Sequence, residues 1–189
     1  MEQAVDKIMQ CIDDIYTVEE SEKEILRFGI QSAIELAINI LLSIFILLKL
    51  HMVWEGLLFF GIFIPIRTLA GGYHSDTYIR CLLFSIVTLI GIMVISDYIE
   101  IPISLSLVAI LIFGGVISKI APVANAERPI SKREYRTFSR RLKVILLFDD
   151  ILSLCLWKMQ CVKAINIINL SFMLILITLV IGKIKYRLY

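Results

Sequence analysis

Two side chains able to perform covalent chemistry lie seven positions apart, between two strongly apolar runs. The stretch "RTLAGGYHSDTYIRC", residues 67–81, contains His74 and Cys81. A cysteine attacks a carbonyl carbon as its thiolate, and a histidine can accept the thiol proton and later return it to a leaving amine. The residue types therefore suit a cysteine acyl-transfer site, although one His and one Cys near a loop also occur together by chance.

The spacing limits how the two side chains could meet. Along one straight helix they would be two turns apart, about 10 Å, which is too far for a hydrogen bond. We therefore expect His74 in a turn that folds back toward Cys81, which would lie in the first turns of the next helix. The double glycine before His74 supplies the permissive backbone, and Ser75 or Asp76 suits the N-cap of that helix.

Other polar residues around this pair have two interpretations each. Asp76 could orient the His74 imidazole, with Ser75 in support, but capping the helix is the expected role. Arg67 and Arg80 flank the loop and could be interfacial anchors. Either could instead favour the thiolate electrostatically or bind a substrate carboxylate. We favour anchoring for Arg80 and leave Arg67 open.

The elements around the loop indicate a membrane protein. The chain has 189 residues, 59% of them hydrophobic, with a mean hydropathy of +0.86, and lipid is the simplest place for such a content. We expect an all-α, polytopic membrane bundle of about six spans. The apolar runs are residues 30–50, 53–66, 81–97, 102–121, 144–157 and 164–182. A span needs about 20 residues, so 53–66 and 144–157 could be half-helices, re-entrant segments or spans extended by polar flanks.

Basic residues predict the orientation. They gather in "KIAPVANAERPISKREYRTFSRRLK", residues 119–143, and in the terminal "KIKYRLY". Such residues favour the cytoplasmic side, so six crossings would place both termini and the His74 loop in the cytoplasm. The 119–143 stretch is equally well interpreted as a topology signal or as a substrate-binding segment.

The chain is expected to be one membrane domain, residues 1–189. Within it, residues 1–28 are predicted to form an amphipathic cytoplasmic helix, because Val5, Ile8 and Met9 follow helical spacing. That helix would lie against the protein or the membrane surface, or would dock a partner helix. Residues 122–143 are predicted to be a basic cytoplasmic loop.

Several classes of site are disfavoured. Cys11, Cys155 and Cys161 form no CxxC pair and only two histidines are present, so we expect no metal and no cofactor. The sequence contains no HExxH or GxSxG motif, which disfavours zinc proteases and serine hydrolases of those types. No nucleic-acid partner is expected.

Three stretches resemble the AgrB family, the accessory gene regulator B peptidases of Gram-positive quorum sensing. The stretch "RTLAGGYHSDTYIRC" resembles the family signature, in which a His is followed seven positions on by a Cys. The second, "APVANAERPI" at 121–130, is similar to the proline–valine segment of the family. The third, "RFGIQSAIE", has Gln31 where the family has Glu or Gln. Together with the length and the apolar runs, the resemblance covers nearly the whole chain.

This resemblance implies a multi-pass cysteine endopeptidase of the cell membrane, acting at the cytoplasmic face on an AgrD-like precursor peptide. Cys81 would be the nucleophile, and His74 the general base and acid. Release of the precursor's acidic tail would leave a thioester, which a Cys or Ser of the precursor would capture as a thiolactone or lactone. The resemblance also implies a homodimer.

The resemblance leaves other roles open. Gln31 could be an oxyanion donor or make a helix–helix hydrogen bond. The family often has an acidic residue after Pro-Val and then lysines, whereas this chain has Ala124 and Arg128 there, so the resemblance leaves the substrate-binding residues open. The basic candidates for binding the acidic tail are Arg67, Arg128, Lys132, Arg133, Arg136, Arg140 and Arg141.

Two further hypotheses come from other functional classes. Glu35, Asp149 and Asp150 lie within apolar runs, where ionisable groups are rare. They could line the path of a small peptide exporter or channel, pair with Lys or Arg, or, for the two aspartates, lie near the edge of a short run. Transport by an exporter would survive loss of Cys81. A non-catalytic scaffold for a sensor kinase would be indifferent to both His74 and Cys81.

Overall fold

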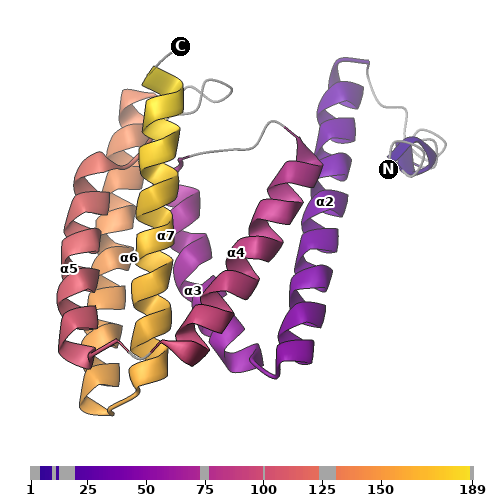
Figure 1. Cartoon of the computed structure of the whole chain (residues 1–189). Coiled ribbons are helices and arrows are strands. Elements are labelled where there is room, and N and C mark those ends of the chain that lie inside the picture. Colours follow the sequence, from indigo (N-terminus) through magenta and orange to yellow (C-terminus); the bar gives the residue numbers. More distant parts are fainter. Residues whose placement is uncertain are drawn as a thin grey trace. The chain divides into compact units, whose positions relative to one another are not determined.

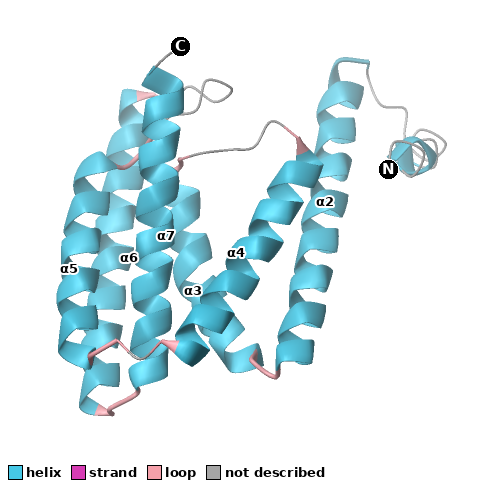
Figure 2. Cartoon of the chain, in the orientation of Figure 1, coloured by secondary structure: helices cyan, strands magenta, loops and turns pink. Residues whose placement is uncertain are grey.

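The computed structural model describes residues 5–9, 12, 20–72, 77–99, 101–123 and 131–187. Over these residues the expected all-helical architecture is confirmed, with one isolated β-bridge besides the helices (Figures 1 and 2). The main helices are α2 (Glu20–Leu50), α3 (Val53–Ala70), α4 (Tyr78–Tyr98), α5 (Ile103–Ile120), α6 (Lys132–Lys158) and α7 (Val162–Arg187).

The chain divides into two compact units, residues 1–46 and 47–189. In the first, residues 5–9 and 12 are helical, as the apolar spacing predicts. Arg27 on α2 forms an ion pair with Asp6, with the two atoms 2.8 Å apart. The expected N-terminal helix over 1–28 is too long, because residues from Glu20 onward already belong to α2.

Among the residues that the structure describes, five helices are long and apolar enough to cross a membrane. Their candidate spans are Gly29–Leu50, Val53–Ala70, Tyr78–Tyr98, Ile103–Ile120 and Val162–Lys185. The short run 53–66 therefore belongs to a helix of full spanning length, since α3 continues through Arg67 to Ala70. The run 144–157 lies inside α6, which is not among the five. Its basic residues, together with Asp149 and Asp150 in its second half, interrupt the apolar segment.

The basic segment before residue 144 is helical rather than a loop. Ser131 accepts a hydrogen bond from the Glu134 N–H at 3.2 Å, and the Glu134 carboxylate accepts one from the Ser131 N–H at 2.9 Å. This capping box starts a helix rich in Arg, Lys and Leu, which are good helix formers. The loop predicted over 122–143 is therefore wrong from residue 132 onward, and α6 runs for 27 residues.

Helix α7 is the central element of the unit formed by residues 47–189. It packs against α3, α4, α5 and α6 (Figure 1). The shared core is aliphatic apart from one phenylalanine ring, and between helices in lipid the close van der Waals packing of such side chains stabilises the contact. Its fully buried members include Ile66, Ile110, Ile117, Leu142, Ile165, Ile168, Phe172, Ile175 and Leu179.

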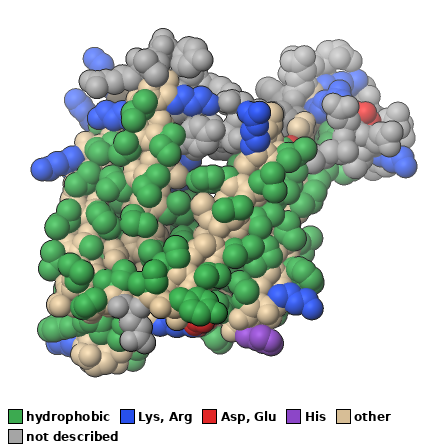
Figure 3. All heavy atoms as spheres, in the orientation of Figure 1, with side chains coloured by type: hydrophobic (Ala, Val, Ile, Leu, Met, Phe, Trp, Pro, Cys, Tyr) green, Lys and Arg blue, Asp and Glu red, His purple; other side chains and the backbone are tan. Residues whose placement is uncertain are grey.

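The outward faces of the helices are also apolar. Exposed residues on α5 include Leu105, Val108 and Leu111. Hydrophobic side chains cover most of the visible helix faces, and Lys and Arg lie mainly near helix ends (Figure 3). An apolar patch of this extent is rare on a soluble monomer and suits contact with lipid.

An ion cluster joins three helix ends. The Lys163 ammonium, at the start of α7, lies 3.2 Å from the Glu55 carboxylate of α3 and 2.9 Å from the Asp97 carboxylate of α4. These residues mark the ends of their apolar segments. The cluster connects the start of α3, the end of α4 and the start of α7.

Candidate active site

The double glycine forms a left-handed turn at the end of α3. Gly71 has φ 70° and donates its N–H to the Arg67 carbonyl at 3.1 Å, and Gly72 has φ 110°. These φ values are readily adopted by glycine and strained for other residues. The expectation that this pair supplies permissive backbone is therefore confirmed.

This turn is joined directly to the end of α5. Gly71 and Val123 form an isolated parallel β-bridge, in which the Val123 N–H donates to the Ala70 carbonyl at 2.9 Å. A Cβ at Gly71 would overlap the Val123 carbonyl oxygen. Two of the stretches singled out in the sequence, residues 67–81 and 121–130, therefore meet backbone to backbone.

Arg67 is held against the second glycine. A Cβ built on Gly72 would lie 2.7 Å from an Arg67 guanidinium nitrogen and 3.1 Å from the Thr178 carbonyl oxygen of α7. Arg67 is half-buried in the last turn of α3. The structure thus places its positive charge at the start of the segment that leads to His74.

Cys81 lies in the first turn of α4, as expected. Its thiol is free and half-buried. Its N–H donates to the Thr77 carbonyl at 3.1 Å, and its carbonyl accepts a hydrogen bond from the Ser85 hydroxyl at 2.9 Å. The backbone of Cys81 is therefore fixed within the regular helix, which limits its side chain to a few rotamers.

The N-cap of α4 differs from the expected one. Thr77 occupies this position with extended backbone, φ −136° and ψ 143°, and its side chain makes no capping hydrogen bond. Ser75 and Asp76 were expected to cap, and this is wrong because the chain is still extended at Thr77. The helix therefore begins at Tyr78.

His74, Ser75, Asp76 and Arg128 lie outside the described residues. The pairing of His74 with Cys81 accordingly stays a prediction, as do the orienting roles of Ser75 and Asp76 and substrate binding by Arg128.

Gln31 makes a hydrogen bond within its own helix. One amide N–H of its exposed side chain donates to the Glu35 carboxylate at 3.0 Å. This is an i, i+4 bond along α2, a geometry that supports helices locally, and not the helix–helix bond considered from the sequence. An oxyanion role for Gln31 stays a prediction.

Three of the basic candidates line one groove between α3 and α6. Arg136, Arg140 and Arg141 of α6 face the last turns of α3 across a volume of about 800 Å³. The remaining lining residues are Pro65, Thr68, Leu69, Thr137, Val144 and Ile145. We call this the α3–α6 groove. It lies beside the segment that ends in the glycine turn.

Lys132 and Arg133 do not line this groove. Both are exposed in the first turn of α6. The basic side chains of α6 that were predicted to form one binding surface therefore lie in two places, some in the α3–α6 groove and some outside it.

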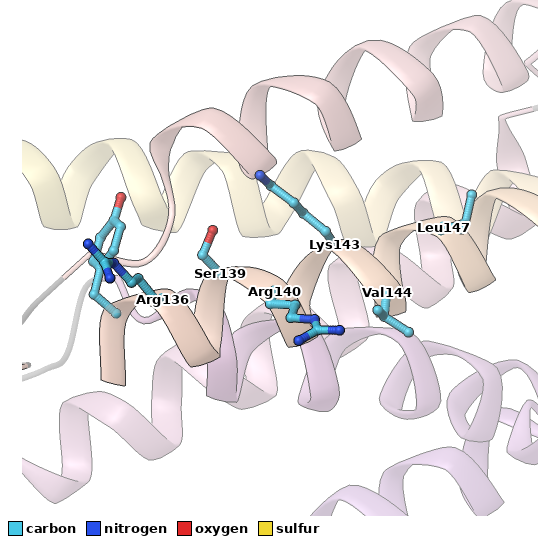
Figure 4. Close-up of a pocket in the computed structure, with 7 residues that line it drawn as sticks. Arg136, Ser139, Arg140, Lys143, Val144 and Leu147 are labelled. Atoms are coloured by element: carbon cyan, nitrogen blue, oxygen red, sulfur yellow. The ribbon is translucent and has the colours of Figure 1, made fainter. Parts of the chain in front are cut away.

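A second groove, of about 450 Å³, is lined by α6 residues. Its lining residues are Tyr135, Arg136, Ser139, Arg140, Lys143, Val144 and Leu147, and we call it the lateral groove (Figure 4). Lys143 was not singled out from the sequence as a binding residue. The signal was its spacing from Arg136 and Arg140, since positions i, i+4 and i+7 share a helix face.

The two aspartates of α6 lie inside the bundle. Asp149 is 2% exposed, and the Asp150 carboxylate lies 3.9 Å from a Cβ built on Gly114 of α5. One carboxylate oxygen of each is buried and has no hydrogen-bond partner in the part of the chain that the structure describes. The interpretation that both lie near the edge of a short run is wrong, because α6 continues to Lys158.

No group of three or more His, Cys, Asp or Glu side chains is placed to hold a metal ion among the described residues. Cys155 and Cys161 are free. The end of α3 thus carries a guanidinium and main-chain polar groups, and the start of α4 carries a thiol.

The fold defines the class of all-helical proteins with several candidate membrane spans, here with a cysteine at the start of one helix and a glycine turn at the end of the preceding one. A family comparison agrees. The chain belongs to the accessory gene regulator B family, AgrB, whose model matches residues 2–181.

A curated relative supports the same family. An AgrB-like protein of Lactiplantibacillus plantarum is 21% identical over 141 residues, which cover 74% of this chain and 70% of that protein. A search of solved structures returns no match. Membership of the AgrB family associates the chain with processing of accessory gene regulator peptides.

Proposed function

We propose that this chain is a membrane cysteine endopeptidase that removes the C-terminal tail of an AgrD-like precursor and promotes its cyclisation to an autoinducing peptide for quorum sensing. The observation that carries the proposal is the pairing of Gly71 with Val123. At this point the stretch that resembles the family signature, residues 67–81, meets the stretch that resembles the family's proline–valine segment, residues 121–130. Four residues, His74 among them, separate Gly72 from Thr77, the N-cap of the helix that carries Cys81.

In the first step, His74 accepts the proton of the Cys81 thiol, and the thiolate sulfur attacks the carbonyl carbon of the scissile peptide bond. The resulting tetrahedral intermediate collapses as the C–N bond breaks. His74 returns the proton to the leaving nitrogen, and the tail departs with a new amino terminus. The rest of the precursor stays bound to Cys81 as a thioester.

In the second step, a Cys or Ser side chain of the precursor attacks the thioester. Its proton passes through His74 to the departing Cys81 sulfur, and a thiolactone or lactone ring closes. This attack is effectively intramolecular, because the nucleophile and the thioester belong to the same bound peptide. A site with little water favours ring closure over hydrolysis.

The oxyanion of each tetrahedral intermediate needs hydrogen-bond donors. The first N–H groups of a helix have no acceptor within that helix, so the Ile79 and Arg80 amides are suitably placed donors next to Cys81. Backbone amides serve this purpose in many acyl-transfer enzymes. Gln31 is the alternative donor.

The acidic tail of the precursor would bind in the α3–α6 groove. Arg136, Arg140 and Arg141 provide the positive charge there, and arginine forms bidentate hydrogen bonds with carboxylates. The groove lies beside the last turns of α3, and Arg67 lies against the glycine turn that follows. This arrangement supports delivery of the residues near the tail toward the Cys81 site.

The same proposal includes the topology. The basic ends of the bundle would face the cytoplasm by the positive-inside tendency. Six crossings, with α6 as the additional one, would then place both termini and the active site on that side. We propose that the enzyme acts as a homodimer.

Mass spectrometry on proteoliposomes tests the function. The purified chain and the precursor encoded beside its gene are incubated, and the released tail and the cyclic product are quantified. Wild type is expected to give both products, with the ring lighter by one water than the linear cleaved peptide. Cys81→Ala and His74→Ala are expected to give neither.

Cys155→Ala is the matched control, because Cys155 is also a free thiol of the same chain and has no role in the proposed reaction. It is expected to process like wild type. Unchanged processing in Cys81→Ala would overturn the peptidase and favour the exporter class. Loss of processing only in His74→Ala would remove Cys81 from the reaction.

A further inference from the structure

The lateral groove combines two chemistries in order along α6. Arg136, Ser139, Arg140 and Lys143 lie toward the start of the helix, and Val144 and Leu147 follow (Figure 4). With a rise of 1.5 Å per residue, the step from Arg136 to Leu147 spans about 16 Å. The groove therefore has a cationic, hydroxyl-bearing end and an aliphatic end.

The lateral groove changes from cationic to aliphatic side chains after Lys143, at the level where α6 is expected to enter the membrane. Beyond Lys143 the outward residues of α6 are apolar, with Phe148 65% exposed and Ile151 52% exposed. Helix α6 packs against α3, α5 and α7, which contain three of the candidate membrane spans. Exposed apolar residues on a helix in this setting face lipid.

The charge of the groove is of one sign. None of its seven lining residues is acidic, and three are cationic. An anionic group in this groove would therefore meet cationic side chains and no carboxylate. Arg136 and Arg140 also line the α3–α6 groove, whereas Lys143, Ser139 and Leu147 belong to the lateral groove alone.

We propose that the lateral groove is a binding site for an anionic phospholipid. The lipid phosphate would accept hydrogen bonds from Arg136, Arg140 and Lys143, and the Ser139 hydroxyl would contact the headgroup. One acyl chain would lie along Val144 and Leu147. An acidic peptide satisfies only the first half of this pattern, because it has no aliphatic chain that continues along the exposed face of α6.

Native mass spectrometry of the purified chain tests this site. The protein in detergent is titrated with phosphatidylglycerol, with phosphatidylethanolamine as the reference lipid, and the bound fraction is measured. Lys143→Gln is expected to weaken phosphatidylglycerol binding about fivefold, because one basic residue near an anionic lipid surface contributes that much. Binding of the reference lipid should stay unchanged, and Lys143→Arg should restore the wild-type value.

Arg141→Gln is the matched control. Arg141 is an exposed basic residue of the same helix that lines only the α3–α6 groove. It is expected to bind phosphatidylglycerol like wild type. If Arg141→Gln weakens binding as much as Lys143→Gln, the effect comes from general surface charge and the proposed site is wrong.

A second pair of variants tests the aliphatic end. Leu147→Ser is expected to weaken phosphatidylglycerol binding, whereas Leu154→Ser, at another exposed leucine of α6 outside the groove, should not. Millimolar inorganic phosphate is expected to compete poorly. Full displacement by phosphate, or equal effects of both leucine variants, would overturn a lipid site.

A further binding measurement uses the acidic tail of the precursor as the ligand. If Lys143→Gln weakens binding of the precursor tail and leaves phosphatidylglycerol binding intact, the groove binds peptide and the lipid assignment is wrong. Because these measurements record binding and not cleavage, their failure is distinguishable from failure of the proposed peptidase.

Discussion

Val123 donates its backbone N–H to the Ala70 carbonyl, and this one bond ties the end of α5 to the end of α3. The carbonyl of Ala70, a residue that is fully buried, is thereby satisfied where the helix stops. The neighbouring bridge to Gly71 leaves no room for a side chain. The start of the His74 segment is therefore held by main-chain geometry.

Gly71→Ala is expected to lower both stability and peptide processing. The variant must place a Cβ at φ 70° and against the Val123 carbonyl oxygen, so we expect a loss of more than about 1 kcal/mol. Thermal unfolding in detergent and the processing assay measure the two effects. Gly115→Ala is the control, because its Cβ would meet nothing within 4 Å in a helix, and equal behaviour of the two variants would contradict the prediction.

Charge reversal in the α3–α6 groove should affect substrate binding more than chemistry. Arg141→Glu is expected to raise KM for an acidic-tailed precursor about tenfold with little change in kcat, since close like charges at an interface cost more than about 1 kcal/mol. Arg133→Glu, at an exposed position that does not line the groove, should change KM much less. An unchanged KM in Arg141→Glu would remove the groove from substrate binding.

The ion cluster at Lys163 is expected to contribute modestly to stability. Its side chains are partly exposed, so a double-mutant cycle between Asp97→Asn and Lys163→Met should give a coupling of about 0.5 kcal/mol. The coupling should fall when salt is raised. Thermal unfolding of the four proteins of the cycle provides the measurement, and a coupling of zero at low salt would show that the contact has no energetic role.

Asp149→Leu is expected to stabilise the bundle and to leave peptide processing intact. The Asp149 carboxylate is buried with one unpaired oxygen in the described part of the chain, and such a group costs about 1–3 kcal/mol. Thermal unfolding and the processing assay measure both outcomes.

Leu146→Asp, at a buried position of the same helix, is the opposite control and should destabilise. A loss of processing in Asp149→Leu, with the fold retained, would instead assign this carboxylate a role in the reaction.

Much of the helical content could be predicted from local sequence. Apolar runs predict spanning helices because a lipid-exposed backbone must satisfy its own hydrogen bonds. The same reasoning placed Cys81 in the first turn of its helix and a glycine turn before His74. Local sequence did not predict where α4 begins, because several neighbouring residues suit the same N-cap position. Ser75, Asp76 and Thr77 all suit an N-cap, and only the observed backbone selects Thr77.

The basic segment shows a second limit. Its charge suggested a basic loop, yet the Ser131–Glu134 capping box starts α6 at this segment. Charge alone could not show that Arg141 lines only the α3–α6 groove and that Lys143 lines only the lateral groove. This difference depends on which side of α6 packs against α3, and that is a property of the bundle.

The sequence by itself determined that this chain would be helical and would contain several candidate membrane spans, because these follow from residue type and short-range spacing. Tertiary structure alone decided that Val123 would meet Gly71 and that Asp149 would be buried. Both depend on how α3, α5, α6 and α7 pack, which is set by contacts between residues far apart in the chain. These contacts cannot be predicted from local sequence patterns.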